Sequence, residues 1–270
     1  MPPTSFRQRY GPWALVAGGS AGLGAEFARQ LARRGLDLVL VAETPHPLEE
    51  LAQALSRTSG VAVRTVVQDL AAPHLLQRIA PQTDDLEVGL VVCNAAHAPI
   101  APFLRQRVED KLRVLDLNCR APLLLVDHYA REMATRRRGG IVIMSSLAGL
   151  LGTALVSTYA ASKAFGTVLA ESLWVELGAL GIDVVAVCPG ATRTPAYLAS
   201  GARSGLLAPR VMQTQPVVSE ALAALGRGPR VVTGRSNRAV AALIDRVLPR
   251  KVAVRLMARA MRATYPRAGE

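Results

Sequence analysis

The sequence predicts an α/β fold with a doubly wound parallel sheet of about seven strands and helices on both faces. Short, continuously apolar segments alternate along the chain with longer segments of helical periodicity, a pattern typical of parallel strands that are buried on both sides. A turn rich in glycine separates the first apolar segment from the first helical one. Half of the 270 residues are apolar, so the chain can bury one large core.

The individual elements follow from two patterns, since continuous apolar runs predict strands and apolar residues at every third or fourth position predict helices. The first helix stops at Gly35, and the helix that follows the fifth strand stops at Gly181. Pro122 predicts a kink or break in its helix because proline has no N–H to donate. The predicted strands are 13–17, 38–42, 61–67, 88–93, 141–144, 184–188 and 230–233, and the later helices are 48–55, 75–79, 108–136 and 159–180.

Residues 1–270 are expected to form a single domain, because no internal repeat and no linker rich in Gly, Pro or Ser divides them. The N-terminus lacks the apolar segment of a secretory signal. Cys93, Cys119 and Cys188 are widely spaced within predicted buried elements. They are expected to be core residues of a reducing compartment, with no disulfide and no metal site. We therefore expect a cytoplasmic protein.

The net charge of +12 raises nucleic acid as a partner, but the charge is concentrated in the tail. From residue 227 onwards there are eleven basic and two acidic residues, without the aromatic residues of a nucleic-acid-binding surface. In a predicted helical tail of about 238–270, basic side chains recur at helical spacing on one side. Such a helix either packs on its own subunit or a partner, which we favour, or makes peripheral contact with an anionic membrane. No nucleic acid partner is expected.

The glycine-rich turn is residues 17–24, Ala-Gly-Gly-Ser-Ala-Gly-Leu-Gly. Gly18, Gly22 and Gly24 permit a tight turn, close approach to a pyrophosphate and close packing of the helix on the strand. The free N–H groups at the start of the following helix favour phosphate. An ordinary glycine-rich loop is the alternative, but the position between the first strand and the first helix favours a dinucleotide site.

Tyr159 and Lys163 are four residues apart in a predicted helix, so they share one face. Ser145 and Ser146 end the preceding strand. Reduction of a carbonyl needs a proton donor at the developing alkoxide. A cation about 5 Å from a phenol, at an effective dielectric of about 20, favours the phenolate by about 3 kcal/mol, or about two pKa units. We expect Lys163 to lower the pKa of Tyr159 in this way, and Ser146 to hydrogen-bond the substrate oxygen; an exposed tyrosine beside a solvated lysine is the alternative.

With these motifs over residues 13–232, the chain resembles the short-chain dehydrogenase/reductase family. The resemblance implies a Rossmann-like, dinucleotide-binding catalytic domain that transfers a hydride between NAD(P) and a small-molecule carbonyl or secondary alcohol. It also implies a homodimer or homotetramer with the two long helices at the interface. Ala17, Cys93 and Ala96 depart from the Thr, Asn and Gly usual in the family. The catalytic residues that it implies are Ser146, Tyr159, Lys163 and Asn118, and the cofactor-binding residues are Gly18, Ser20, Gly22, Leu23, Gly24, Glu43, Asp69, Leu70, Asn94, Ala95, Tyr159, Lys163, Pro189, Gly190, Thr192 and Thr194.

Two of these positions, and the choice of nicotinamide, leave alternatives open. Asn118 could instead satisfy a kink near Pro122, and Asp69 could be only a turn residue. Members of the family that prefer NADP usually have a basic residue just after the second strand, where this chain has Glu43. An acid near the ribose accepts hydrogen bonds from the diol and repels a 2′-phosphate, which favours NAD over NADP. If Glu43 points to solvent, nearby Arg64 could bind the phosphate instead.

The segment of about 196–216 is expected to be a substrate lid. It contains several large apolar residues and few acids, which favours an apolar substrate such as a steroid or fatty-acyl chain. Two other functions compete with an enzyme: a dinucleotide-binding regulatory protein without turnover, and an adaptor that uses the basic tail. Ser146, Tyr159 and Lys163 favour the enzyme, because a sensor needs no proton donor. The lid residues that lead to this expectation of an apolar substrate are Tyr197, Leu198, Leu206, Leu207, Val211 and Met212.

Overall fold

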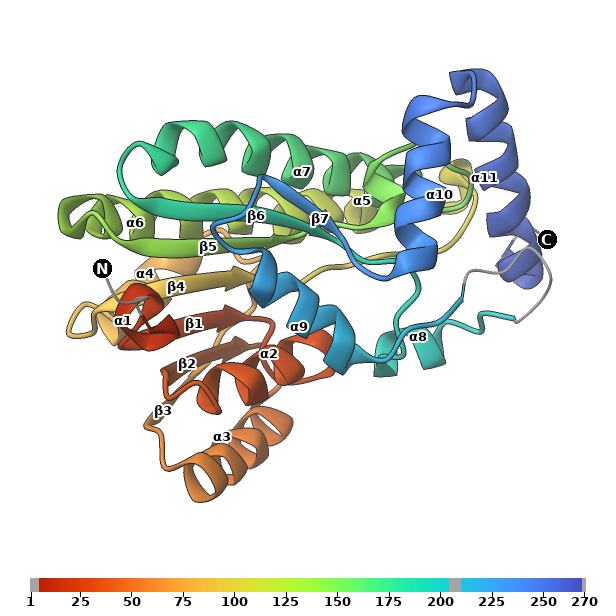
Figure 1. The fold of residues 1–270 in the computed structure, drawn as a ribbon. Coiled ribbons are helices and arrows are strands. Elements are labelled where there is room, and N and C mark those ends of the chain that lie inside the picture. Colours follow the sequence, from red (N-terminus) through yellow and green to blue (C-terminus); the bar gives the residue numbers. More distant parts are fainter. Residues whose placement is uncertain (1–4, 204–209, 269–270) are drawn as a thin grey trace.

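The computed structural model describes residues 5–203 and 210–268, which form a single seven-stranded sheet (Figure 1). All strand pairs are parallel, in the spatial order β3-β2-β1-β4-β5-β6-β7. The predicted doubly wound parallel sheet is therefore confirmed, including its seventh strand. The strands are β1 (Trp13–Ala17), β2 (Asp37–Ala42), β3 (Val63–Val67), β4 (Val88–Cys93), β5 (Gly139–Met144), β6 (Ile182–Cys188) and β7 (Arg230–Val232).

Each face of the sheet has its own apolar core, because side chains of a strand alternate between the two faces. Phe27 and Leu40 are fully buried in one core, and Leu15 and Met133 in the other. Burial on both faces explains why the strands are almost continuously apolar. The first face is covered by α2 (Gly22–Ala32), α3 (Pro45–Ser59) and α9 (Thr214–Ala224), and the second by α4 (Leu75–Ile79), α6 (Ala121–Arg136) and α7 (Ser157–Gly178) (Figure 1).

The long helical stretch 108–136 bends without breaking. It consists of α5 (Val108–Leu115), a π-helical turn (Asp116–Arg120) and α6. Pro122 is the second residue after the π-helical turn, in the first turn of α6, and has no N–H to donate to the carbonyl of residue 118. The kink predicted from Pro122 therefore takes the form of one widened turn, a feature that occurs often at functional sites.

One short helix near each end of the strands, which the sequence patterns did not reveal, and the predicted helical tail complete the fold. At the N-terminal side of the strands, α1 (Phe6–Tyr10) is held by a hydrogen bond of 2.7 Å from the Tyr10 hydroxyl to Asp183. At the opposite end, toward which the strands point, lie α8 (Pro195–Ala199), α10 (Arg235–Arg246) and α11 (Arg250–Thr264) (Figure 1). Among the described residues, no helix combines the length and the apolar character needed to span a membrane.

The basic tail packs on its own subunit. The N–H of Arg203 donates to the carbonyl of Thr264 at the end of α11, at 2.9 Å. At the other end of this helix, the Arg250 guanidinium donates to the carbonyl of Leu150 at 3.3 Å. Ala253 is buried between these two contacts. The tail is thus attached to the segments that follow β5 and β6, in agreement with the interpretation favoured from the sequence.

Candidate active site

Most of the predicted site residues gather at one edge of the sheet, because they lie in the segments that follow the carboxyl ends of several strands. Gly18 follows β1, Glu43 follows β2 and Asn94 follows β4. Farther along the sheet, Ser146 and Pro189 follow β5 and β6. The chain changes direction across the sheet between β1 and β4, which is where open α/β sheets bind their ligands.

The glycine turn is closed by the segment that follows β4. The amide of Asn94 donates to the carbonyl of Gly18 at 2.9 Å. Gly18 has a φ of +82° and Gly22 a φ of +55°, a region that L-residues rarely adopt. A Cβ on Gly18 would lie 2.8 Å from the backbone of Ala95, and one on Gly24 would collide with the Gly18 carbonyl. All three positions therefore require glycine.

This turn fits the pyrophosphate of a dinucleotide. α2 begins at Gly22, and no side chain caps the N–H groups of its first turn, which leaves them for an anion. Ser20, before this helix, is half-buried, and Leu23 in its first turn packs partly against the core. The chemistry that a bound nicotinamide dinucleotide supplies is the transfer of a hydride.

The segment after β6 reaches back to the glycine turn. A Cβ on Gly22 would lie 3.1 Å from the methyl group of Thr194, so the two segments nearly touch. The Thr194 hydroxyl caps α8 by accepting the Tyr197 N–H at 3.1 Å. Thr192 is buried, and its hydroxyl donates to the carbonyl of Gly190 at 3.0 Å. The Pro189 carbonyl accepts from the Leu147 N–H at 3.0 Å, which joins this segment to the one after β5.

The proposed catalytic side chains meet beside the end of β5. The Lys163 ammonium lies 5.6 Å from the centroid of the Tyr159 ring and donates to the carbonyl of Met144 at 2.7 Å. Ser146 is close enough to Tyr159 to act on the pKa of its phenol as a hydrogen-bond partner. The neighbouring Ser145 instead points into the core and bonds to the carbonyl of Lys163 at 2.7 Å. Of the two serines, only Ser146 faces Tyr159.

Burial governs the ionisation of this group more strongly than the sequence suggested. It raises the pKa of Tyr159 above its usual value, although the hydrogen bond with Ser146 acts in the opposite direction. The net direction is thus opposite to the one expected from Lys163 alone, whose ammonium is not among the causes of this shift. Burial also lowers the pKa of Lys163 to about 8, because the ammonium loses its hydration. Lys163 is still mostly protonated at neutral pH.

Asn118 lies in the π-helical turn and joins three segments. Its amide donates to the carbonyl of His97 at 3.0 Å and to the hydroxyl of Ser162 at 2.9 Å. Its oxygen accepts from the His97 N–H at 2.8 Å. Ser162 is the residue before Lys163, so Asn118 connects the segment after β4 to α7, the helix that carries Tyr159 and Lys163.

At the other end of the site, Glu43 and Asp69 share an arginine that the sequence did not single out. The Arg113 guanidinium, from α5, donates to Asp69 at 2.9 Å and to Glu43 at 3.1 Å. Arg64 lies elsewhere and pairs with Asp85 at 2.6 Å. The alternative in which Arg64 serves the cofactor phosphate is thus not supported. The Leu70 side chain is buried in the core, so that only its backbone is available to a ligand.

The described part of the lid segment meets the end of the basic tail. Tyr265, just after α11, is close enough for its charge to raise the pKa values of both Tyr159 and Tyr197, to which burial contributes most. Tyr197 and Leu198 belong to α8, whereas Leu206 and Leu207 lie outside the described residues. Tyr265 was not identifiable from the sequence, because nothing in its local pattern connects it with Tyr159, more than a hundred positions away.

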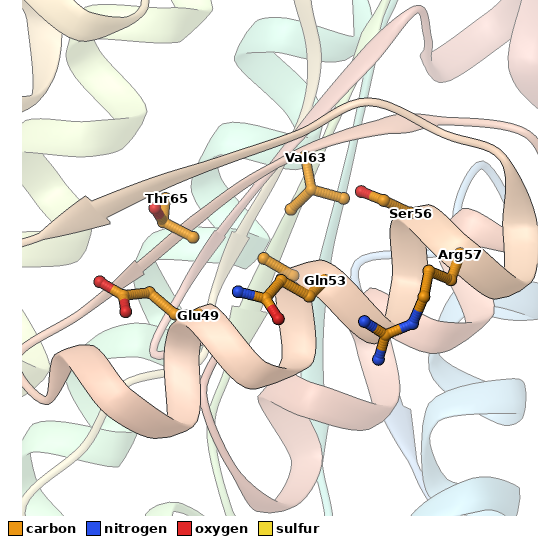
Figure 2. A pocket seen from close by; sticks show the side chains of 7 residues that line it. Glu49, Gln53, Ser56, Arg57, Val63 and Thr65 are labelled. Atoms are coloured by element: carbon orange, nitrogen blue, oxygen red, sulfur yellow. The ribbon is translucent and has the colours of Figure 1, made fainter.

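A surface hollow of about 450 Å³ lies apart from this group, between α3 and the edge strand β3 (Figure 2). It contains none of the predicted site residues. The side chains that line it belong to α3 and to β3, the edge strand of the sheet. They do not place a phenol beside a buried ammonium, as Tyr159 and Lys163 do. It is therefore not the candidate active site. The labelled residues that line it are Glu49, Gln53, Ser56, Arg57, Val63 and Thr65.

Comparisons with known proteins agree with this geometry. A 7beta-hydroxysteroid dehydrogenase of Clostridium sardiniense is 29% identical over 87% of this chain and 90% of its own length. A very-long-chain 3-oxoacyl-CoA reductase of Aspergillus clavatus is 34% identical over 80% of this chain, which spans 63% of that protein. A solved short-chain dehydrogenase from Sphingobium yanoikuyae in complex with NADPH is 36% identical, with a TM-score of 0.75 over 82% of this chain and 87% of that one.

The family model for short chain dehydrogenases matches residues 12–203. That range contains the glycine turn, Asn118, Ser146, Tyr159 and Lys163. The chain therefore belongs to the short-chain dehydrogenase family and is an NAD(P)-dependent oxidoreductase.

Proposed function

We propose that this enzyme uses NAD to interconvert an apolar secondary alcohol and its ketone, with Tyr159 as the residue that exchanges the proton. One observation carries the proposal: a phenol, a hydroxyl and a buried ammonium converge at the carboxyl edge of the sheet. Ser146 is close enough to Tyr159 to act on the pKa of its phenol, and the Lys163 ammonium lies 5.6 Å from the centroid of the Tyr159 ring. A structural role alone would not require a buried lysine beside a tyrosine, since burying a charge is costly.

Each residue has a distinct part in the proposed reaction. In the reducing direction, Tyr159 donates its phenolic proton to the oxygen of the substrate as that oxygen gains negative charge. Ser146 donates a hydrogen bond to the same oxygen and orients it toward the phenol. The Lys163 ammonium stabilises the phenolate that remains. Asn118 positions these groups by joining α7 to the segment at His97.

The preference for NAD is supported by Glu43, which follows β2 where an acid can accept hydrogen bonds from the adenosine ribose. Gly18, Gly22, Gly24, Asn94 and Ala95 would surround the pyrophosphate and the neighbouring ribose. On the nicotinamide side we assign contacts to the segment that follows β6. Those residues are Pro189, Gly190, Thr192 and Thr194.

An apolar substrate is supported by the lid and by the relatives. Tyr197 and the exposed Leu198 lie on α8, and Tyr265 lies close to the catalytic tyrosine. The named relatives act on a hydroxysteroid and on an acyl-CoA ester with a very long chain. Steroid ketones and long-chain 3-oxoacyl esters are therefore the substrate classes to test first.

The test is a panel of ketones and secondary alcohols with each nicotinamide, followed at the nicotinamide absorbance. We expect turnover of apolar ketones with NADH. Tyr159→Phe should reduce turnover by about 10²–10⁴-fold, the usual contribution of general acid catalysis, and should still bind NADH. Tyr10→Phe, in α1 at the opposite end of the strands, is the matched control and should keep full activity. Full activity in Tyr159→Phe would exclude the mechanism.

We also propose a homodimer or homotetramer assembled through α6 and α7. The outer face of α7 exposes an apolar stripe that includes Val168 and Val175, and nearby Leu123 on α6 is exposed as well. Exposed apolar patches of this kind mark contacts between proteins. Light scattering after gel filtration should give a multiple of the 28.6 kDa chain mass, and Val168→Asp with Val175→Asp should lower it to that of a single chain.

For its location, we propose a cytoplasmic enzyme; as a second candidate, the outer side of the packed tail makes peripheral contact with membranes. The three free cysteines support a reducing compartment. Val247, just after α10, and Leu256, on α11, are exposed, and basic side chains such as Arg255 lie in the same tail, a combination that favours anionic lipid. Co-sedimentation with anionic vesicles should fall when Val247 and Leu256 are both changed to Ser. Equal sedimentation of the variant and the parent would exclude the contact.

A further inference from the structure

A cation stands next to the residue on which the choice of nicotinamide depends. The Arg113 guanidinium is held by two carboxylates: its Nη1 lies 2.9 Å from Asp69, and its Nη2 lies 3.1 Å from Glu43 and 3.3 Å from the second Asp69 oxygen. The Glu43 side chain is 63% exposed, whereas those of Arg113 and Asp69 are both 38% exposed. Glu43 is thus the weaker of the two anchors.

The three residues come from separate segments that the fold brings to one place. Glu43 directly follows β2, and Asp69 follows the neighbouring β3, whose last residue pairs with Ala42. Arg113 reaches them from α5. Glu43 also stands nineteen residues after Gly24, close to the spacing at which dinucleotide-binding folds place an acid on the ribose 2′-hydroxyl. The Arg113 guanidinium is therefore hydrogen-bonded to Glu43, the residue that would contact that hydroxyl.

Asp69 keeps Arg113 in place independently of Glu43. Burial would raise the pKa of the Asp69 carboxyl, but hydrogen bonds from Arg113 and from the Ala71 N–H lower it overall. The pair with Asp69 uses two nitrogens of the guanidinium, the geometry that fixes an arginine most firmly. Loss of the Glu43 carboxylate would leave Arg113 anchored, with a donor released toward the ribose position.

We propose that Arg113 is a cofactor-selectivity residue: Glu43 occupies its guanidinium, and loss of the Glu43 carboxylate makes the same guanidinium a binding partner for the 2′-phosphate of NADP. The inference rests on the proposed function, since it needs an NAD-preferring enzyme. With both carboxylates present, the cluster carries one net negative charge and repels a phosphate. Without Glu43 it is neutral, and a planar guanidinium suits phosphate oxygens better than an ammonium does.

The experiment measures equilibrium affinities for NADH and NADPH by nicotinamide fluorescence in the full-length protein. Four proteins are compared: the parent, Glu43→Gln, Arg113→Gln and the double variant. We expect Glu43→Gln to bind NADPH at least about tenfold more tightly than the parent, equivalent to about 1.4 kcal/mol. The double variant should lose most of that gain. Arg113→Gln alone should not improve NADPH binding.

Two controls separate local from general charge effects. Glu50→Gln removes an exposed acid on α3, and Arg107→Gln removes an exposed base that pairs with Asp110 beside α5. Neither should change the preference between the two dinucleotides.

Thermal unfolding of each variant verifies the fold. Arg113→Lys serves as a second variant, because it keeps the positive charge but loses the planar guanidinium. Combined with Glu43→Gln, it should retain only part of the NADPH gain.

The outcomes are distinguishable. If Glu43→Gln and the double variant bind NADPH equally tightly, the gain comes from relief of repulsion alone and the role of Arg113 is overturned. That role is also overturned if Glu43→Gln binds NADPH no better than the parent does. If the parent protein binds neither dinucleotide, the proposed function itself fails, together with the inference that depends on it.

Discussion

Replacing Lys163 by methionine tests how the ammonium acts on Tyr159. The charge lies 5.6 Å from the centroid of the phenol ring, and at an effective dielectric of about 20 the attraction to a phenolate is about 3 kcal/mol. Such an energy corresponds to about two pKa units. Burial already raises the pKa of Tyr159, and loss of the ammonium would raise it further. Methionine has a comparable size and no charge, so packing changes little.

The assay is the pH dependence of alcohol oxidation, in which the Tyr159 phenolate accepts the proton. With saturating NAD, kcat/KM for the alcohol is measured from about pH 6 to about pH 10, which reaches the ordinary pKa of a phenol. In the parent protein the ammonium favours the phenolate only below about pH 8, because the pKa of Lys163 is about 8. In Lys163→Met the rise in activity should therefore be displaced to higher pH, most strongly below about pH 8 and by no more than about two units.

A matched control is available in the same protein. Lys111 also places its ammonium over an aromatic ring, 4.0 Å from the centroid of Phe103, but it is distant in sequence from the catalytic helix α7. Lys111→Met should leave the pH profile unchanged. If Lys163→Met retained the midpoint of the parent protein while binding NAD, the electrostatic role assigned to Lys163 would be refuted.

Individual contacts lead to three further predictions. Ser146→Ala should lower kcat by about 10²–10³-fold through loss of a donor to the substrate oxygen. Ser145→Ala removes a buried hydrogen bond to the Lys163 carbonyl and should instead lower the free energy of unfolding in urea by about 1–3 kcal/mol. Gly24→Ala should abolish NADH binding, as measured by fluorescence, because its Cβ would lie 2.7 Å from the Asn94 amide, whereas Gly178→Ala, with open space around it, should bind normally. Burial lowers the pKa of Lys163 from 10.5 to about 8, so the folded state holds this proton more weakly than the unfolded state does. The protonated lysine therefore destabilises the folded state by about 3 kcal/mol below pH 8, and this cost disappears as the pH rises from 8 to 10.5. Over that range the unfolding free energy of the parent protein, measured relative to that of Lys163→Met, should increase by the same amount.

Much of the fold and of the catalytic group could be predicted from local sequence. The apolar runs and helical periodicities each lie within one segment, and a chain that alternates them has few ways to bury both faces of a sheet. Tyr159 and Lys163 share a helix face because they are four residues apart. Gly18, Gly22 and Gly24 were identifiable because a turn between strand and helix has its own steric demands.

The charges and contacts between distant segments were decided only by the tertiary structure. Arg113 meets Glu43 and Asp69 from a helix forty-four and more residues away, and Tyr265 approaches Tyr159 from the end of the chain. No local pattern encodes such pairs, because they depend on how whole elements pack. The raised pKa of Tyr159 has the same origin: the residue types specify a phenol and an ammonium, but the loss of hydration that dominates the ionisation exists only once the surrounding segments have folded around them.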